Sequence, residues 1–351
     1  MKMNILFKIC IYIFLLYGNI MIGYANSKIL NIYIWGNYLP EIVCQKFTAE
    51  TGITINITEY DNNETMFSKL SSIKKSGYDI VVPSNYYIER MIKLGMLHPL
   101  NKNKLIGLKN IHPILLSQSF YLNDIYSIPY LWGNTGIIIN TKYIKENITH
   151  WKDFWNSKYK NQLVLLNDMR DTFNIALLTL GYSINETNPK HIYEAYYKLK
   201  TLMTNIKIFN VDTIHNIYID EDAVIGVIWD GDFNIIKKEN NFLKYIYPKE
   251  GFSTWLESFV ILKDAPNIDN AYTFINFMLR PEIAKIVSIY TGYSNANIKA
   301  IYSKSLQSVI HKRQFKKINM SLISTGQFQK DLSPEARRLY EKYWTLLRIG
   351  Q

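Results

Sequence analysis

The chain has 351 residues, 48% of them hydrophobic, and its 40 Lys and Arg residues outnumber its 29 Asp and Glu residues to give a formal net charge of +11. This length favours two domains over one small core, and the hydrophobic content excludes a largely disordered chain. The basic residues are scattered, without a long basic stripe or an arginine-rich arm, so we expect no nucleic-acid partner.

Residues 1–25 have the pattern of a secretory signal peptide. Lys2 and Lys8 accompany an apolar stretch, and Gly23 and Ala25 place small residues before a possible cleavage site. The apolar run is shorter and more interrupted than a typical transmembrane helix. The alternative interpretation is an uncleaved anchor helix. We therefore expect an exported, periplasmic protein that is cleaved near Ala25.

Cleavage at this position leaves Cys44 as the single cysteine. We expect no internal disulfide, so the fold must be stabilised by packing. The helical spacing of PEIVCQKF predicts that Cys44 is a small, buried hydrophobic side chain.

The beginning of the mature chain alternates between strand and helix. Strand-like patterns occur at 29–35, 53–60 and 78–84, and helical spacing occurs at 40–52, 62–77 and 86–97. Pro40 begins the first helix. Asn62 or Asn63 caps the second helix, which we expect to end at Gly77.

The rest of the chain repeats this alternation. Strand-like runs occur at 136–144, 162–166, 223–229 and 258–265, and helices are predicted at 167–183, 232–240, 267–280, 281–292 and 333–350. The sequence contains no internal repeat and no long Gly/Ser linker. Strand–helix–strand alternation predicts an α/β protein with largely parallel strands.

Several polar and aromatic side chains lie at the ends of the predicted strands or shortly after them. They are Trp35, Ser84, Asp168, Trp229, Asp230 and Asp232. In open α/β sheets, ligands bind beyond the carboxyl ends of the strands. We therefore predict that these side chains converge on one crevice.

The candidate site combines aromatic rings with carboxylates. The rings are Trp35, Tyr38, Tyr86, Trp229, Trp255 and Tyr293, and the acids are Asp168, Asp171, Asp232 and Glu257, with Asp230 as a further candidate. Ring faces attract ammonium groups by roughly 0.5–2 kcal/mol each and cover methylene groups, while carboxylates form charge-assisted hydrogen bonds to amines. The set therefore suits a flexible chain with separated cations, such as a polyamine.

Each residue also has an ordinary structural interpretation, and a second chemistry fits the set. Trp35 alone is typical of a core tryptophan, and Asp232 fits a helix cap. Asp168 and Asp171 fit acids that complement a helix dipole, or the paired acids of an exported carbohydrate-active enzyme. The six histidines lack metal-ligand spacing, and no GxSxG or Walker A motif is present, so we expect no metal and no other cofactor.

Long blocks of the sequence resemble the periplasmic spermidine/putrescine-binding proteins of polyamine ABC importers. The blocks are YIWGNYLPEIVCQKFTAETGI, YDNNETMFSKL, YDIVVPSNYYIERMIKLGML, YSIPYLWGNTGIIIN, NPKHIYEAYYKLKTLM, VIGVIWDGDFN and INFMLRPEIAK. They follow one another in order over nearly all of the mature chain. The resemblance is specific because the blocks are long and lie far apart.

The resemblance implies a two-lobed, type II-like periplasmic binding protein fold. Each lobe would be a mixed sheet flanked by helices, with a hinged cleft between the lobes. Residues 1–25 would be the signal peptide. The N-terminal lobe would combine residues 26–133 with 258–305, and the C-terminal lobe would combine residues 134–257 with 306–351.

The resemblance also implies a ligand site in the cleft. The matching residues are Trp35, Tyr38, Ser84, Tyr86, Asp168, Asp171, Trp229, Asp232, Trp255, Glu257, Tyr293 and Gln329. Aromatic rings would bracket the methylenes, and the acids would bind the terminal amines. Ser84, Tyr38 and Gln329 would add hydrogen bonds.

Some positions depart from the family pattern. Gly36 and Val211 stand where hydroxyl residues are usual. Asp171 replaces the usual glutamate, and Glu257 replaces the usual aspartate. Asp232 matches putrescine-type members, whereas spermidine-type members tend to have serine there. The choice between spermidine and putrescine stays open, and the overall similarity favours spermidine.

We therefore expect a monomeric polyamine-binding subunit that captures spermidine or putrescine by hinge closure. It would deliver the ligand to ABC permease subunits in the inner membrane and would not be an enzyme. The alternatives are the carbohydrate-active enzyme and a binding protein for another small cationic solute.

Overall fold

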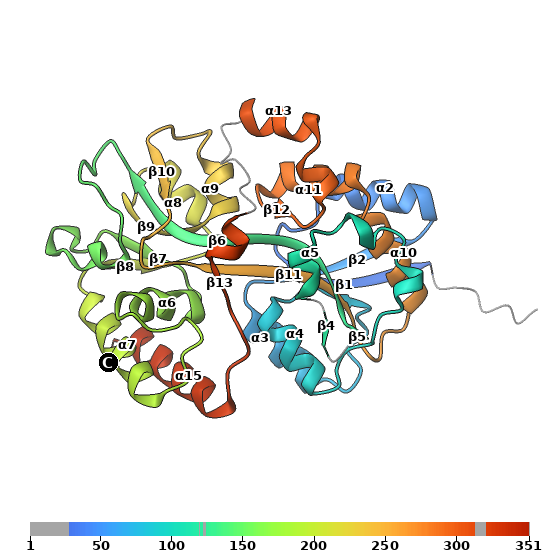
Figure 1. Cartoon of the computed structure of the whole chain (residues 1–351), viewed down its shortest axis with the longest axis horizontal. Helices are drawn as coiled ribbons and strands as arrows, with labels where there is room; N and C mark the ends of the chain where they lie inside the picture. The colour runs from blue at the N-terminus through green and yellow to red at the C-terminus, as the bar shows by residue number, and fades with distance from the viewer. Residues whose placement is uncertain (1–27, 119, 122–123, 313–320, 351) are drawn as a thin grey trace, which may run out of the picture.

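The structure is a computed structural model that describes residues 28–118, 120–121, 124–312 and 321–350 (Figure 1). The predicted signal peptide, with its cleavage site, lies outside the described residues. The strands are β1 (Ile29–Trp35), β2 (Thr54–Tyr60), β3 (Ile80–Val81), β4 (Phe120–Tyr121), β5 (Asp124–Ile125), β6 (Ser127–Asn140), β7 (Leu163–Leu165), β8 (Ile206–Phe209), β9 (Ile225–Trp229), β10 (Leu243–Ile246), β11 (Ser253–Ile261), β12 (Ser294–Asn295) and β13 (Gln327–Phe328).

Helices occupy most of the remaining chain. The α-helices are α2 (Glu41–Thr51), α3 (Asn63–Ser72), α4 (Asn85–Lys93), α5 (Pro113–Ser117), α6 (Met169–Thr179), α7 (Pro189–Leu202), α8 (Ile214–Ile219), α9 (Asp230–Ile236), α10 (Ile268–Met278), α11 (Pro281–Thr291), α12 (Ile298–Ile301), α13 (Lys304–Lys312), α14 (Leu322–Thr325) and α15 (Pro334–Arg348). Short 3₁₀ helices are η1 (Lys102–Lys104), η2 (Leu108–Asn110), η3 (Trp151–Trp155) and η4 (Ser157–Tyr159).

Eleven strands form one hydrogen-bonded sheet in the order β2-β1-β3-β11-β6-β9-β7-β8, with β10 and β12 paired to β6 and β13 paired to β11. β1, β2 and β3 are parallel, and so are β7, β8 and β9. Between these groups, β11 and β6 run antiparallel to each other and to their outer neighbours. The predicted α/β fold with mixed sheets is confirmed, but the expectation of largely parallel strands is wrong at the centre.

The two central strands are long and cross the middle of the molecule (Figure 1). All 14 residues of β6 and all nine residues of β11 are buried. The sequence predicted strands only at 136–144 and 258–265, because glycine and polar residues interrupt the apolar pattern before those positions. Gly133 allows the strands to pack closely, since a Cβ there would lie 2.4 Å from the Trp255 ring.

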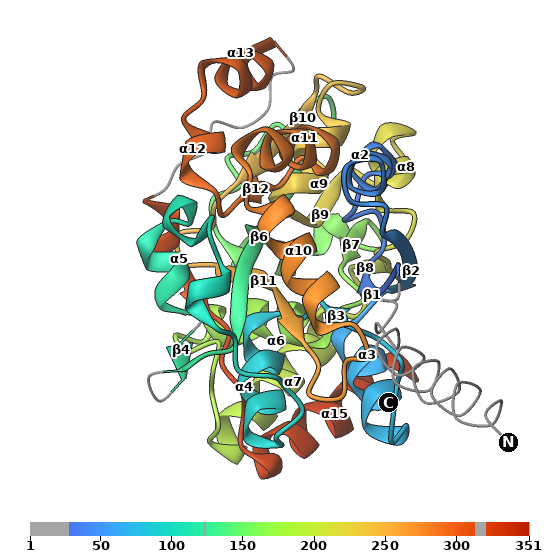
Figure 2. The same ribbon diagram turned by 90° about the vertical axis from the view of Figure 1, so that its right-hand side faces the viewer.

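The buried hydrophobic side chains form two large clusters. The first contains Phe47 and Phe274, whose ring centroids are 5.3 Å apart, and α10 lies in front of β11 and β1 on this side (Figure 2). The second contains Phe173 and Tyr340, with centroids 4.9 Å apart, where α6, α7 and α15 gather (Figure 1). The clusters divide on β6 between Trp132 and Ile137.

We propose two lobes around these clusters, with the predicted boundaries of 26–133 with 258–305 and 134–257 with 306–351. These boundaries stay a prediction. Trp255 packs with the first cluster, although the prediction assigns it to the second lobe.

Three local predictions need correction. α3 ends at Ser72 and not at Gly77, because Ile73 already has an extended backbone with φ −113° and ψ 123°. α4 ends at Lys93, short of the predicted residue 97. Cys44 is only partly buried against the first cluster, although this burial still raises the pKa of its thiol to about 11.

None of the helices in the described ranges is both long enough and apolar enough to cross a membrane.

Candidate ligand-binding site

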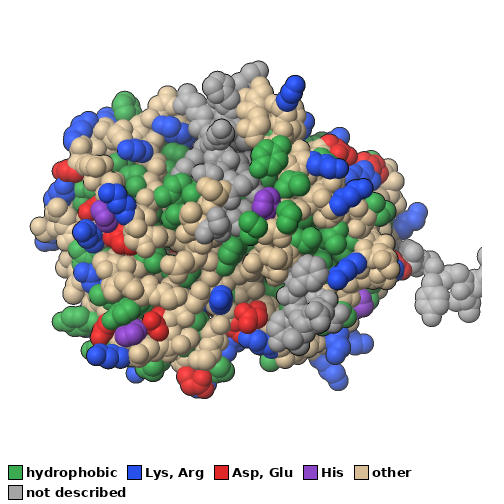
Figure 3. Space-filling view, in the orientation of Figure 1, with side chains coloured by type: hydrophobic (Ala, Val, Ile, Leu, Met, Phe, Trp, Pro, Cys, Tyr) green, Lys and Arg blue, Asp and Glu red, His purple; other side chains and the backbone are tan. Residues whose placement is uncertain are grey.

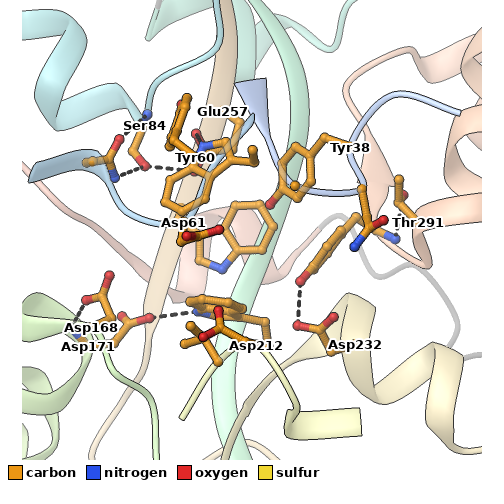
Figure 4. A pocket seen from close by; sticks show the side chains of 18 of the residues that line it. Tyr38, Tyr60, Asp61, Ser84, Asp168, Asp171, Asp212, Asp232, Glu257 and Thr291 are labelled. Carbon is orange, nitrogen blue, oxygen red and sulfur yellow. Dashed lines mark hydrogen bonds between the residues drawn. The ribbon is translucent and has the colours of Figure 1, made fainter. Parts of the chain in front are cut away.

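The strand ends and the two long strands surround a cavity of about 400 Å³ (Figure 4). All twelve side chains predicted from the sequence line it, namely Trp35, Tyr38, Ser84, Tyr86, Asp168, Asp171, Trp229, Asp232, Trp255, Glu257, Tyr293 and Gln329. Trp35 ends β1 and Trp229 ends β9. Ser84 and Asp168 occupy the N-cap positions of α4 and α6. The strand-end rule therefore accounts for much of the lining.

Glu257 is a buried carboxylate in the middle of β11, and it is 3% exposed. A register shift between Glu257 and Ser258 interrupts the regular pairing of β11 with β6. The carboxylate accepts hydrogen bonds from the Ser84 hydroxyl at 2.7 Å and from the Trp35 indole N–H at 2.9 Å. Burial raises the pKa of Glu257 to about 8, and these hydrogen bonds offset the rise only in part.

Asp171 lies in the first turn of α6 and is 4% exposed. One carboxylate oxygen accepts from the Thr135 hydroxyl at 2.9 Å and the Trp229 indole N–H at 2.8 Å. The other accepts from the Ser253 hydroxyl at 2.8 Å and the Gln329 amide at 3.1 Å. All four donors are neutral, so they orient the carboxylate without compensating its charge.

Asp168 caps the same helix by accepting the Asp171 backbone N–H at 2.8 Å. Burial raises the pKa of Asp168 well above its usual value, and the nearby charges of Asp171 and Glu64 raise it further. The Arg170 charge offsets part of this rise. Asp168 and Asp171 therefore form an electrostatically strained pair that a cation would relieve.

Aromatic rings line the space between the carboxylates (Figure 4). The Trp255 and Tyr293 rings meet edge to face with centroids 5.0 Å apart, and Tyr38 lies 5.6 Å from Tyr293. Trp35 packs on Tyr60 with centroids 4.8 Å apart. Burial raises the pKa values of Tyr38 and Tyr293 well above 10, so both phenols keep their protons. The rings present neutral π surfaces that suit cations and methylene groups.

Asp232 lies at the opposite end of the cavity from Asp168 and Asp171 (Figure 4). It accepts a hydrogen bond from the Tyr293 hydroxyl at 2.7 Å, and its other oxygen lies 2.8 Å from His215 Nε2. Gly231 makes this arrangement possible, because a Cβ at that position would lie 1.9 Å from the Tyr293 ring. Gly231, between the two aspartates at the start of α9, thus leaves room for the Tyr293 ring to donate its hydrogen bond to Asp232.

The charge of the lining is strongly unbalanced. Its carboxylates are Asp61, Asp168, Asp171, Asp212, Asp232 and Glu257. Of the described residues that line the cavity, none is Lys or Arg, and His215 is the single basic side chain. No group of three or more potential ligand side chains among the described residues is arranged to hold a metal ion. The excess of carboxylates in the lining favours a cationic ligand.

Comparison with known proteins gives the family. Residues 43–312 match the family described as bacterial extracellular solute-binding protein. The chain belongs to this family.

Relatives and solved structures of similar solute-binding proteins extend the match. The spermidine/putrescine-binding periplasmic protein of Salmonella typhimurium is 38% identical over 328 residues, which cover 93% of each chain. The putrescine-binding periplasmic protein SpuD of Pseudomonas aeruginosa is 28% identical and covers 93% of this chain and 94% of its own. A putative spermidine/putrescine ABC transporter structure from Listeria monocytogenes is 34% identical, with a TM-score of 0.86 and coverage of 93% and 100%. The two-lobed fold predicted for this solute-binding protein is therefore confirmed.

The structure also brings residues to the cavity that the sequence did not single out. They are Asn37, Tyr60, Asp61, Asn63, Asp212, His215, Ile235, Tyr290 and Thr291. Gly36 and Val211, which the sequence analysis noted as departures from the family pattern, also line it. Asn63 donates hydrogen bonds to the Ser84 hydroxyl at 2.8 Å and to the Tyr86 hydroxyl at 3.1 Å, which orients both groups. Asp230, a less certain candidate in the sequence, does not line the cavity.

Replacing Gly231 by alanine is expected to destabilise this solute-binding protein by about 1–3 kcal/mol, because the new methyl group forces the Tyr293 ring away from α9. The matched control is Gly36→Ala, since a Cβ at Gly36 has no neighbour within 4 Å. Denaturant unfolding followed by circular dichroism measures both variants. Equal free energies of unfolding for the two variants would contradict the close packing of Tyr293.

Proposed function

We propose that this solute-binding protein binds spermidine or putrescine and delivers it to the permease of an ABC importer. The observation that carries the proposal is a cavity with carboxylates at both ends, aromatic rings between them, and no Lys or Arg among its described lining residues. The names of the relatives point to the same ligand class.

The proposed ligand pose follows from this layout. One ammonium group would bind Asp168 and Asp171, and a second would bind Glu257, which loses its proton when a cation arrives. The rings of Trp229, Trp255 and Tyr293 would cover the methylene groups, at about 0.8 kcal/mol per buried CH₂.

The proposed mechanism is closure of the two lobes around the cation. Ser84 and Trp35 contact Glu257 from one side of the cavity, while Asp171 and Trp229 lie on the other. A ligand that contacts both sides stabilises the closed form by its differential affinity for that form. β6 has residues in both clusters, the chain passes from β10 in the second cluster to β11 in the first, and residues 328–332 run from the first cluster to the second. These three connections would carry the hinge.

The proposal also covers location and assembly. We propose that the protein is exported to the periplasm with removal of a signal peptide near Ala25. It would act there as a monomer, would catalyse no reaction, and would meet its permease at the inner membrane.

The test is isothermal titration calorimetry with spermidine and putrescine. Replacing Trp255 by alanine is expected to weaken binding about 10- to 100-fold, because the ligand loses a large ring surface and its cation–π attraction. Asp168→Ala should weaken binding in the same direction, and Tyr302→Ala, a 65% exposed tyrosine, is the control.

A thermal-shift panel of amines and sugars separates this proposal from the carbohydrate-active alternative. Polyamines are expected to raise the melting temperature, and sugars are expected to leave it unchanged. Wild-type protein that gives no heat with either amine would refute the proposal. A rise only with sugars, together with release of new reducing ends, would favour the enzyme.

A further inference from the structure

His215 is a basic side chain in a cavity that otherwise attracts cations. It lies on α8, is 38% exposed, and places Nε2 2.8 Å from Asp232 Oδ1. The Tyr293 hydroxyl occupies the other Asp232 oxygen at 2.7 Å. Both oxygens therefore have a partner within the protein, and an incoming ammonium group must compete for this carboxylate.

We propose that His215 determines the ligand length that the cavity accepts, by competing with an ammonium group of the ligand for Asp232. This inference rests on the proposed polyamine-binding function and names a specificity determinant within it. A diamine bound at the Asp168–Asp171 end leaves the His215–Asp232 pair intact. A triamine that also reaches Asp232 must displace the imidazole.

The difference between the two ends of the cavity decides where a short ligand binds. Asp171 accepts four hydrogen bonds from neutral donors, and its charge adds to the repulsion on Asp168. Asp232 instead faces a partner that can carry a positive charge. A diamine gains more Coulomb energy at the Asp168–Asp171 pair, because the Arg170 charge offsets the repulsion there only in part. His215 therefore disfavours only ligands that extend to Asp232.

Proton exchange on His215 reports this competition. Burial lowers the pKa of His215, but the hydrogen bond and the charge of Asp232 outweigh burial and raise the pKa above its usual 6.5. An ammonium group on Asp232 removes this support and repels the imidazolium, so the pKa of His215 falls and a proton is released. The ratio of triamine to diamine affinity must therefore rise with pH across the titration of His215.

Other titratable groups share the surroundings of His215. Asp212 and Asp220 flank α8, and Asp232 lies on α9. The other groups are Tyr290 in the last turn of α11, Tyr293 just after that helix, and the cavity-lining residues Tyr38 and Asp61. Glu257 and Asp168 also release protons when a cation binds, because burial raises the pKa of each carboxyl. The contribution of His215 is therefore the difference between wild type and a variant that keeps these groups.

The experiment is calorimetry at pH 7 in phosphate and in Tris buffer, which reports the number of protons released. His215→Gln keeps a neutral N–H donor of similar reach. Spermidine is expected to release more protons from wild type than from this variant, whereas putrescine is expected to release equal numbers. The spermidine-to-putrescine affinity ratio of wild type should rise roughly tenfold between pH 5.5 and pH 8, and the variant should lose this rise.

His191→Gln is the matched control, because His191 also pairs with a carboxylate, Glu186 at 3.0 Å, but does not line the cavity. It should behave as wild type does. Equal proton release for spermidine in wild type and His215→Gln would overturn the inference. The inference would also be overturned if wild type released more protons than His215→Gln by the same number with spermidine and with putrescine. Absence of binding by both amines would refute the proposed function itself, which is a distinguishable result.

Nuclear magnetic resonance of the wild-type chain gives a second test that needs no variant. Among the six histidine ring signals, one is expected to show a pKa that falls on saturation with spermidine and stays unchanged with putrescine. Titration curves that spermidine leaves unchanged would overturn the inference.

Discussion

Replacing Asp171 by asparagine is expected to weaken spermidine binding about 100-fold, which corresponds to roughly 3 kcal/mol. The change removes a buried negative charge that four neutral donors orient and none compensates. It also turns one acceptor oxygen into an NH₂ group that faces hydrogen-bond donors such as the Trp229 indole N–H. The ligand-free variant should therefore also unfold at a lower temperature.

Calorimetry at fixed pH measures the affinity, and thermal unfolding without ligand measures the stability. The control is Asp212→Asn, because Asp212 lines the cavity but is exposed to solvent. An exposed charge is screened, so its loss should change the affinity by less than about fivefold. Equal losses at Asp171 and Asp212 would mean that burial and orientation do not matter, which would contradict the proposed pose.

The alternation of strands and helices predicted the first two strands and the helix between them well. β1, β2 and α2 lie within a residue or two of their predicted ranges, since their apolar periodicity is regular and Pro40 and Gly52 mark the ends of the helix. β8 and β10 were not predicted from periodicity, because each has only four residues, and two of those in β8 are exposed. The antiparallel direction of the central strands depends on long-range pairing that local patterns do not contain.

The sequence predicted some residues of the candidate site better than others. Trp35 and Asp168 follow strands, so the strand-end rule places them at the cavity. Trp255 and Glu257 lie inside a strand that is buried on both faces, where alternation gives no direction. Their residue types made them candidates, and the resemblance assigned them to the cleft. His215 carried no local signal, because its partner Asp232 lies 17 residues away on another helix.

The second large expected effect concerns Glu257 and the pH dependence of the free energy of unfolding. Its pKa is about 8 in the folded protein against 4.5 as the ordinary value. The folded state therefore binds more protons than the unfolded state between these values, and the free energy of unfolding must fall as pH rises from about 5 to 8. The difference of 8 − 4.5 = 3.5 pH units corresponds to at most about 5 kcal/mol. Glu257→Gln should remove the contribution of Glu257 to this slope and leave the ligand-free protein more stable than wild type at pH 8.

Ligand binding should show the opposite slope, because an ammonium group needs the ionised carboxylate. Affinity for spermidine is expected to rise by up to roughly tenfold per pH unit from pH 6 to pH 8 in wild type, with a smaller rise in Glu257→Gln. Loss of a proton from the ligand at higher pH would weaken its binding to carboxylates, so the ligand charge does not cause the expected rise. Calorimetry and denaturant unfolding at pH 6, 7 and 8 measure both slopes, with Glu282→Gln, an exposed glutamate outside the cavity, as the control. Ionisation of Glu257 contributes to both slopes. A Glu257→Gln variant whose unfolding slope falls while its binding slope stays unchanged would show that this buried carboxyl does not bind the cation.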